Sequence, residues 1–334
     1  MSVLEKVYNK AKKNPARLAF PEAENEKMLL AAQEAIRQGY ITGVLVGDKA
    51  NVLSAIEKYA IDETLFEIVD VTNEDAQKQL VSEYFKTGQS MYGEKGLMRR
   101  ASDPLYYALM LQALGKIDCT FAGIENTTGN VILSSQTFLG LNPEVATVSS
   151  CGIVDIPGFK GSEGSLIGFG DSAVCQNPTA EELASIAISV CETFAALLDW
   201  EPRCAMLSYS SQGSGEGVLV DKVVEAVKLA NEKRPDLMIE GEFQLDSALN
   251  PDVASKKIKG DSKVAGNANI IIWPDLNAGN IGIKSIQLFA NAVSFGPILQ
   301  GFNKTVADCS RGASVSDILG NIAIASVRAM NNSH

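Results

Sequence analysis

Residues 17–48 read RLAFPEAENEKMLLAAQEAIRQGYITGVLVGD, and this stretch decides the fold class. The apolar run RLAF is followed by a long helical pattern and then by the β-branched run YITGVLVGD. The next residues repeat the alternation, because the helical pattern KANVLSAIEKYAI is followed by LFEIVDV. Strands that alternate with helices in this way are typical of a parallel, doubly wound sheet. We therefore predict an α/β fold.

The alternation continues to the end of the chain. The segment TAEELASIAISVCETFAALLD predicts a helix capped by Thr179, with Glu182 completing a capping box. Further strands are predicted in RCAMLSYSS, DLMIEGEFQ and NANIIIWPDL, and further helices in LVDKVVEAVKLANEKRP and SVSDILGNIAIASVRAM. At residues 148–171 helical patterns give way to Gly, Pro and short apolar runs, and we place a domain crossover there.

Composition limits the classes of function. The chain has 334 residues, 46% of them hydrophobic, which is enough for a large core in two domains or in one large α/β unit. Its net charge of -11 disfavours nucleic acid and anionic membrane surfaces as partners. The first residues, MSVLEKVYNKAKKNPARLAF, predict an amphipathic helix and a strand, with no signal peptide or membrane span. We expect a cytoplasmic protein.

Cysteine and histidine usage limits the chemistry. The six cysteines are dispersed without a CxxC pair, so we expect reduced thiols that are mostly small core residues. The only histidine is His334. Zinc-histidine sites, a Ser-His-Asp triad and a histidine base are therefore disfavoured, and we expect no metal site. Acid–base work falls to Asp, Glu, Lys, Tyr or Cys.

Ligands of open α/β sheets bind at the carboxyl ends of strands. Three such positions carry polar or flexible residues. The loop after CAMLSYS offers Ser208, Tyr209, Ser210 and Gly213, the segment IENTTGN offers Thr127 and Thr128, and the segment DLNAGNIG offers Asn277, Gly279 and Asn280. The alternatives are a polar connection for the first, helix capping for the second, and for the third a plain turn in which Gly279 takes a positive φ.

The stretch DCSRGASVSD, residues 308–317, carries the least ordinary cation. Ser314 and Asp317 fit a capping pattern ahead of the closing helix, so a purely structural Asp317 is one interpretation. Capping does not explain Arg311. An arginine just before a helix start meets the positive end of the helix dipole, which is unfavourable unless an anion lies between them.

Together these segments resemble the phosphate acetyltransferase (phosphotransacetylase) branch of the phosphate acetyl/butyryltransferase family. The resemblance runs nearly end to end. It rests on FPEAENEKMLLAA, NPTAEELASIAI, PRCAMLSYSSQGS, EGEFQLDSAL, VAGNANIIIWPDLNAGNIG, GPILQG and SRGASVSDI, in family order.

The resemblance implies a two-domain fold similar to that of isocitrate and isopropylmalate dehydrogenases. The first domain would be discontinuous, residues 1–148 plus 304–334, and the second, residues 149–303, would form a homodimer, with the active cleft between the domains. The implied enzyme is an acyltransferase that converts acyl-CoA and phosphate into acyl phosphate and CoA. CoA is then a co-substrate, and no permanently bound cofactor is expected.

By motif, Ser310, Arg311 and Asp317 correspond to the family's catalytic residues. We expect direct transfer in a ternary complex, with Arg311 turned to the phosphate and away from Asp317. An acyl-cysteine at Cys309 is disfavoured because no histidine can activate that thiol.

The chain departs from the family pattern at two arginines, which are replaced by Leu133 and by a residue near Thr87. Three hypotheses follow: a phosphate acetyltransferase, a relative that prefers propionyl or butyryl groups, and a catalytically weak paralogue that binds acyl-CoA or phosphate. A metal-dependent dehydrogenase on the related fold is a more distant alternative.

Overall fold

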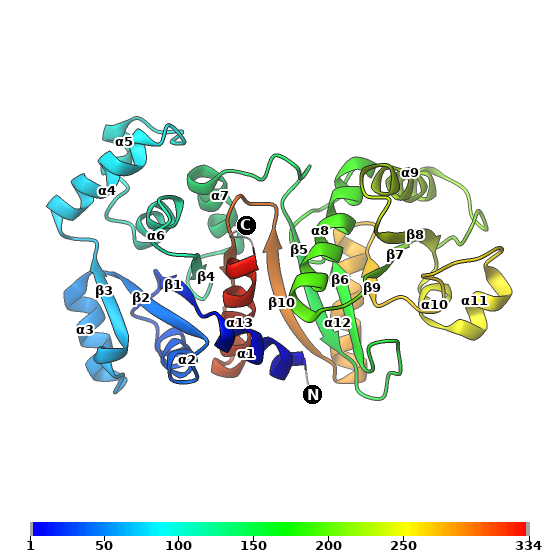
Figure 1. The fold of residues 1–334 in the computed structure, drawn as a ribbon, viewed down its shortest axis with the longest axis horizontal. Coiled ribbons are helices and arrows are strands. Elements are labelled where there is room, and N and C mark those ends of the chain that lie inside the picture. Colours follow the sequence, from blue (N-terminus) through cyan, green and yellow to red (C-terminus); the bar gives the residue numbers. More distant parts are fainter. Residues whose placement is uncertain (1–2, 332–334) are drawn as a thin grey trace. The chain divides into compact units, whose positions relative to one another are not determined.

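The computed structural model of the protein describes residues 3–331. The chain divides into two compact units, one made of the residues up to Asn142 and from Phe302 onward, the other of Pro143–Gly301. Each unit is built around its own β-sheet (Figure 1). No helix within residues 3–331 is long and apolar enough to cross a membrane.

The sheet of the first unit is entirely parallel, with the strand order β11-β4-β1-β2-β3. Its strands are β1 (Ala16–Phe20), β2 (Ile41–Gly47), β3 (Phe66–Asp70), β4 (Cys119–Ala122) and β11 (Val306–Asp308). Every residue of β4 is buried, as are four of the five in β1. Continuous apolar strands of this kind are found where helices cover both faces of a parallel sheet.

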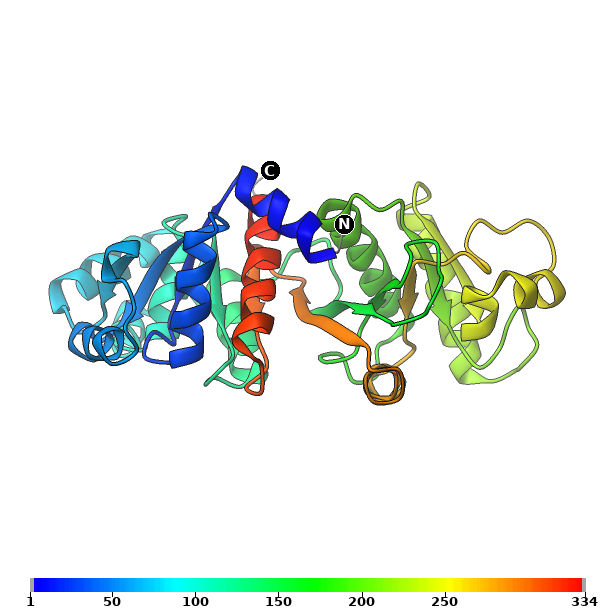
Figure 2. The ribbon, with the colours of Figure 1, turned by 90° about the horizontal axis from the view of Figure 1, so that it is seen from below.

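Helices cover both faces of this sheet. The described helices are α1 (Val3–Lys13), α2 (Glu26–Arg37), α3 (Lys49–Lys58), α4 (Glu74–Lys86), α5 (Glu94–Met98), α6 (Pro104–Ala113), α7 (Thr128–Leu139) and α13 (Val315–Asn331), with a short 3₁₀ turn at Glu63–Leu65. Helices α2 and α13 lie side by side on one face, and α6 and α7 lie on the other (Figures 1 and 2).

The direction of winding changes between β1 and β4. From β1 the chain proceeds through α2 to β2 and β3, and it later returns to place β4 on the opposite side of β1. Neighbouring strands whose connections leave in opposite directions form a crevice at their carboxyl ends, where ligands of open α/β sheets bind. In this unit the residues after β1, β4 and β11 surround that position.

The second unit has the strand order β10-β5-β6-β9-β7-β8. Its strands are β5 (Ser149–Asp155), β6 (Leu166–Gly170), β7 (Arg203–Leu207), β8 (Met238–Phe243), β9 (Ile270–Ile272) and β10 (Val293–Gln300). Strands β6, β9, β7 and β8 are parallel, whereas β5 pairs antiparallel with both β6 and β10. The predicted parallel α/β fold is confirmed. The antiparallel pairs, which the pattern of residues 148–171 did not indicate, are an addition to it.

The helices of the second unit are α8 (Ala180–Leu198), α9 (Val218–Lys233), α10 (Leu245–Leu249), α11 (Pro251–Lys257) and α12 (Leu276–Ala290). The capping box predicted for α8 is present, with Thr179 and Glu182 each accepting a backbone N–H of the other.

The plain turn that was one interpretation of residues 275–282 is wrong, because these residues form the start of α12, capped by Asp275. Gly279 is helical and does not take a positive φ. Its missing side chain serves packing, since a Cβ there would lie 2.4 Å from the carbonyl oxygen of Asp171.

Candidate functional site

Glu22 follows β1 and holds together the loop between β4 and α7. Its carboxylate accepts the backbone N–H groups of four consecutive residues, Gly123, Ile124, Glu125 and Asn126, at 2.8 to 3.1 Å. The side-chain amide of Asn126 donates a fifth bond at 2.9 Å. Glu22 is only 4% exposed. A buried charge needs donors of this kind, and the five bonds fix the backbone just before α7.

Asp308, at the end of β11, is a second buried carboxyl group and is 2% exposed. Its Oδ2 accepts a hydrogen bond from the Thr128 hydroxyl at 2.6 Å. Its Oδ1 is buried without a hydrogen-bond partner in the described part of the chain. Burial, together with the negative charge of Glu22, raises the pKa of Asp308 to about 6, although the bond from Thr128 and the nearby backbone N–H of Cys309 act in the opposite direction.

Gly123 allows these segments to meet. It has a φ of +105°, and a Cβ on it would lie 2.0 Å from Asp308 Oδ1 and 2.6 Å from the carbonyl oxygen of Cys309. A side chain is therefore excluded both by backbone conformation and by space. The end of β11 and the loop after β4 are in contact at this residue.

The segment Ser310-Arg311-Gly312 connects β11 to α13 and is exposed. The Lys27 ammonium group of α2 donates to the carbonyl oxygen of Ala313 at 3.0 Å, which ties the segment to the neighbouring helix. Arg311 makes no hydrogen bond or ion pair with any residue that the structure describes. Its guanidinium group is thus unpaired beside the start of α13, and it is not bound to Asp317.

Asp317 lies in the first turn of α13 and completes its cap. Its Oδ2 accepts the backbone N–H and the hydroxyl of Ser314, at 2.9 and 2.7 Å, and the Asp317 N–H donates to Ser314 Oγ at 3.2 Å. The capping interpretation is therefore confirmed. The second carboxylate oxygen, Oδ1, has no hydrogen bond within residues 3–331, and the side chain is exposed. A structural role and a chemical role are compatible in this residue.

The two predicted threonines have different surroundings. Thr127 is the N-cap of α7, and its Oγ1 accepts the backbone N–H of Asn130 at 3.1 Å. Thr128 is half-buried and joins α7 to Asp308. Within the first unit the structure thus brings Thr128 close to the segment that carries Ser310 and Arg311.

The remaining predicted residues lie in the second unit, after β7 and at the start of α12. Ser210 is fully buried and donates to Glu242 Oε1 at 2.8 Å, and the same oxygen accepts the N–H of Gly213 at 2.8 Å. Ser208 Oγ accepts the N–H of Ser210, and the exposed Tyr209 donates its hydroxyl hydrogen to the carbonyl oxygen of Glu216. Much of the hydrogen-bonding capacity of this loop is used within the loop and on Glu242.

Asn277 and Asn280 are exposed on the first turns of α12. The Asn280 amide donates to the carbonyl oxygen of Ser172 at 3.3 Å. Their place on a helix start leaves both side chains accessible to a ligand.

Cys309 is next to the candidate residues, but it is 1% exposed. Burial first, and then the charges of Glu22 and Asp308, raise the pKa of its thiol far above the usual range. A nucleophilic cysteine requires a stabilised thiolate, so this environment disfavours an acyl-cysteine. All six cysteines are free of disulfides. Residues 3–331 contain no group of three His, Cys, Asp or Glu side chains arranged to hold a metal ion.

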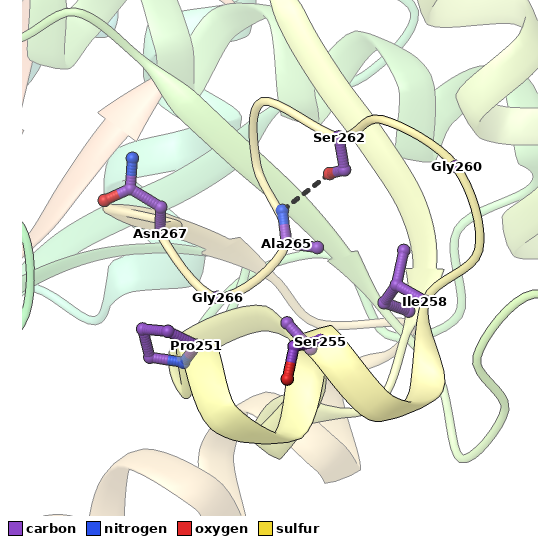
Figure 3. Close-up of a pocket in the computed structure, with 9 residues that line it drawn as sticks. Pro251, Ser255, Ile258, Gly260, Ser262, Ala265, Gly266 and Asn267 are labelled. Atoms are coloured by element: carbon purple, nitrogen blue, oxygen red, sulfur yellow. Dashed lines mark hydrogen bonds between the residues drawn. The ribbon is translucent and has the colours of Figure 1, made fainter.

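An open pocket of about 340 Å³ lies elsewhere in the second unit, between α11 and the loop that follows it (Figure 3). Its lining contains only small, apolar or neutral polar residues: Pro251, Ala254, Ser255, Ile258, Gly260, Ser262, Ala265, Gly266 and Asn267. None of the predicted site residues lines it. Without a titratable group in its wall, this pocket offers no acid–base chemistry.

Glu22, Gly123 and Asp308 were missed by the sequence analysis. The signal for two of them was present, because Glu22 and Asp308 are polar residues at or just after the end of an apolar strand. The rule that selected the loops after β4, β7 and β9 applies equally to β1 and β11.

The chain is similar to known proteins over nearly its whole length. Residues 2–326 match the family model described as phosphate acetyl/butaryl transferase. The chain is similar to the phosphate acetyltransferase of Clostridium acetobutylicum, with 38% identity covering 98% of this chain and 99% of the relative. It is also similar to the solved structure of a phosphotransacetylase from Streptococcus pyogenes, with a TM-score of 0.90 and 30% identity, covering 99% and 100% of the two chains.

A putative 4-hydroxythreonine-4-phosphate dehydrogenase from Salmonella typhimurium shares the fold at a TM-score of 0.54 and 11% identity, covering 94% and 99% of the two chains. At that identity the likeness concerns the fold alone.

Proposed function

Since this chain belongs to the family of phosphate acetyl/butaryl transferases, we propose that Ser310, Arg311 and Asp317 carry out the family's reaction. The protein is an acyltransferase of acetate metabolism that converts acetyl-CoA and phosphate into acetyl phosphate and CoA. The names of its relatives favour the acetyl group over propionyl and butyryl. CoA is a substrate, and we propose that no further cofactor is bound.

The observation that carries the proposed role of Arg311 is its unpaired, exposed guanidinium group. An arginine held beside a helix start meets the positive end of the helix dipole, which is unfavourable unless an anion lies between them. A phosphate placed there receives the guanidinium fork in a bidentate contact and also lies at the positive end of α13. This geometry favours phosphate or acetyl phosphate as the bound anion.

The proposed reaction is a direct transfer in a ternary complex. In the direction of acetyl phosphate formation, a phosphate oxygen attacks the thioester carbonyl carbon, the C–S bond breaks, and the CoA sulfur leaves. Asp317 Oδ1, the oxygen not used in capping, passes the proton of the attacking hydrogen phosphate to the leaving sulfur in this direction, and it takes the thiol proton in the reverse. Ser310 donates a hydrogen bond to the sulfur or to the transferring group.

The proton affinities of an aspartate and a thiol determine when the proton moves between Asp317 and the CoA sulfur. Ordinary pKa values of about 3.9 for Asp and 8.5 for a thiol differ by roughly 4 to 5 units, or about 6 kcal/mol for complete proton transfer. In the reverse direction, Asp317 therefore does not deprotonate free CoA in advance. The proton moves to Asp317 while the sulfur attacks acetyl phosphate. The second-unit residues Ser208, Tyr209, Ser210, Gly213, Asn277, Gly279 and Asn280, with Thr127 and Thr128, stay predicted substrate-binding residues.

We also propose a homodimer in the cytoplasm. The helix α12 exposes Ile281, Leu288 and Phe289 at 64%, 76% and 86%, and Val293 at the start of β10 is 51% exposed. Large apolar side chains that gather on one surface are typical of association sites. Free cysteines throughout the chain support a reducing compartment.

The test is phosphate-dependent release of free thiol from acetyl-, propionyl- and butyryl-CoA, with Arg311→Ala beside the wild type. We expect acetyl-CoA to be fastest, and we expect the variant to lose at least a hundredfold in kcat/KM, because a charged contact in the transition state is worth about 3 kcal/mol or more. The matched control is Arg37→Ala, an exposed arginine in the last turn of α2. Absence of turnover in the wild type would instead favour a binding paralogue.

A further inference from the structure

Thr128 and Asp308 form a pair whose hydrogen bond can run in either direction. In the described geometry the hydroxyl of Thr128 donates to Asp308 Oδ2 across 2.6 Å. A threonine hydroxyl has one hydrogen and can also accept. While its hydrogen points to Asp308, the hydroxyl of Thr128 presents only lone pairs to its other neighbours. It cannot donate a hydrogen bond to an anion in that state.

A proton on Asp308 reverses this bond. The protonated carboxyl group donates to Thr128 Oγ1, and the threonine hydrogen then turns away from Asp308. Thr128 is the first residue of α7, where the backbone N–H groups of the helix start also point outward. In that state the helix start and the hydroxyl both present donors, which is what a phosphate oxygen requires.

The surroundings make both protonation states of Asp308 accessible. The side chain is 2% exposed, one carboxylate oxygen has no partner within residues 3–331, and its pKa is raised to about 6. The titratable and charged groups that face it are Glu22 from the loop after β1, whose charge disfavours a second negative charge there, and Cys309 on its own segment, whose backbone N–H favours one. Two cations belong to the neighbouring segments. Lys27 of α2 is bound to the carbonyl oxygen of Ala313, and the unpaired Arg311 follows Asp308 by three residues.

We propose that Asp308 is a positioning residue that sets the direction of the Thr128 hydroxyl, so that binding of a phosphate-type anion at the start of α7 is coupled to uptake of one proton by Asp308. The inference rests on the proposed function, because it takes the phosphate bound by Arg311 to lie also against the start of α7. The step balances, because the carboxylate of Asp308 takes up one proton from solvent. The hydroxyl hydrogen of Thr128 stays on its own oxygen, and only its hydrogen bond changes partner, from Asp308 to the anion.

The sign of the pH effect follows. The anion binds better to the protonated form, so affinity is highest below the pKa of Asp308 and falls as the pH rises through it, by up to tenfold per pH unit. By the same linkage the bound anion raises the pKa of Asp308 further.

The test is calorimetric titration of the full chain with sulfate between pH 5.5 and 8, in pairs of buffers that differ in ionisation enthalpy. Sulfate is a suitable probe because it stays a dianion throughout this range, whereas phosphate itself titrates. The wild type is expected to take up close to one proton per bound sulfate near pH 7. In kinetics, the KM for phosphate, after correction for the ionisation of phosphate itself, should carry this dependence and kcat should not.

Asp308→Asn is the informative variant, because an amide donates to Thr128 permanently and cannot titrate. We expect it to bind sulfate at least as tightly as the wild type does at pH 6, with no proton uptake and no change across the range. A variant that keeps the wild-type pH dependence, or that binds sulfate more weakly at every pH, overturns the proposal.

Two further variants keep the test decisive if Asp308→Asn does not fold. Thr128→Ser retains the hydroxyl and should retain the proton uptake, whereas Thr128→Val should abolish it and weaken sulfate binding. Equal behaviour of the two overturns the proposal. Because sulfate binding needs no turnover, proton-linked binding in a protein without transferase activity would contradict the proposed function and leave this coupling intact.

Discussion

At the scale of single residues, Asp308 makes a prediction about stability that is independent of catalysis. Its folded-state pKa of about 6 lies above the ordinary value of 3.8, so its stabilising contribution is fully present below about pH 4 and is lost as the pH rises through 6. A difference of about 2 units corresponds to roughly 3 kcal/mol at pH 8. Asp308→Asn cannot ionise and is expected to unfold at higher urea concentration than the wild type above pH 6.

The measurement is the urea midpoint at several pH values from 4.5 to 8, for both proteins. The advantage of Asp308→Asn should grow with pH and should be smallest at pH 4.5, where the wild-type carboxyl group is already protonated. Asp261→Asn, at an exposed loop position, is the control and should follow the wild type. Two midpoint curves that run parallel over the whole range would show that ionisation of Asp308 costs the fold nothing.

At the scale of elements, the start of α13 separates the structural role of its cap from the chemical role of Asp317. Ser314→Ala removes the acceptor of the Asp317 N–H and is expected to cost about 1 kcal/mol of stability. Asp317→Asn keeps an oxygen that accepts from Ser314 but loses the proton acceptor. We expect it to retain most of the stability and to lose roughly a hundredfold or more in kcat.

Both variants are measured by urea unfolding and by thiol release under saturating substrates. The expected result is a crossing pattern, in which the less stable variant is the more active one. If Ser314→Ala lowers kcat as far as Asp317→Asn does, the cap positions the whole segment and the activity cannot be assigned to the carboxylate alone.

The elements also show which inferences a sequence supports. The cap of α8 was predicted correctly because Thr179 and Glu182 lie in one turn and need no other part of the chain. The role of Gly279 was predicted wrongly, because its missing side chain is required by the approach of Asp171, a residue 108 positions earlier. Packing of that kind leaves no local signal.

The candidate site also contains residues with a local sequence signal and residues whose roles depend on distant parts of the chain. Arg311 and Asp317 stand out locally, one as a cation before a helix start and the other as part of a capping pattern. The roles of Glu22 and Asp308 depend on partners about a hundred or more positions away, brought together by the parallel order of β1, β4 and β11. Their polar character was visible in the sequence, but their contacts were not.

At the scale of the whole molecule, the two units show unequal amounts of exposed apolar side chain. Within the second unit two helices carry three such groups each: α12 has Ile281, Leu288 and Phe289, and α9 has Val218, Leu219 and Val224. Phe289 is the most exposed of these side chains at 86%, and Leu288, 76% exposed, lies beside it in the last turn of α12, which leads directly to the exposed Val293 of β10. The end of α12 is therefore our candidate for the dimer contact.

The prediction is that Leu288→Glu with Phe289→Glu converts the proposed homodimer into a monomer, because two buried carboxylates facing their own copies would each lose hydration and repel one another. Light scattering on a sizing column gives the mass directly, and the unfolding midpoint of the monomer should no longer depend on protein concentration. Val224→Glu on α9 is the matched substitution and should remain dimeric. Should Val224→Glu dissociate while the α12 variant stays paired, the contact belongs to α9, and the apolar end of α12 has another partner.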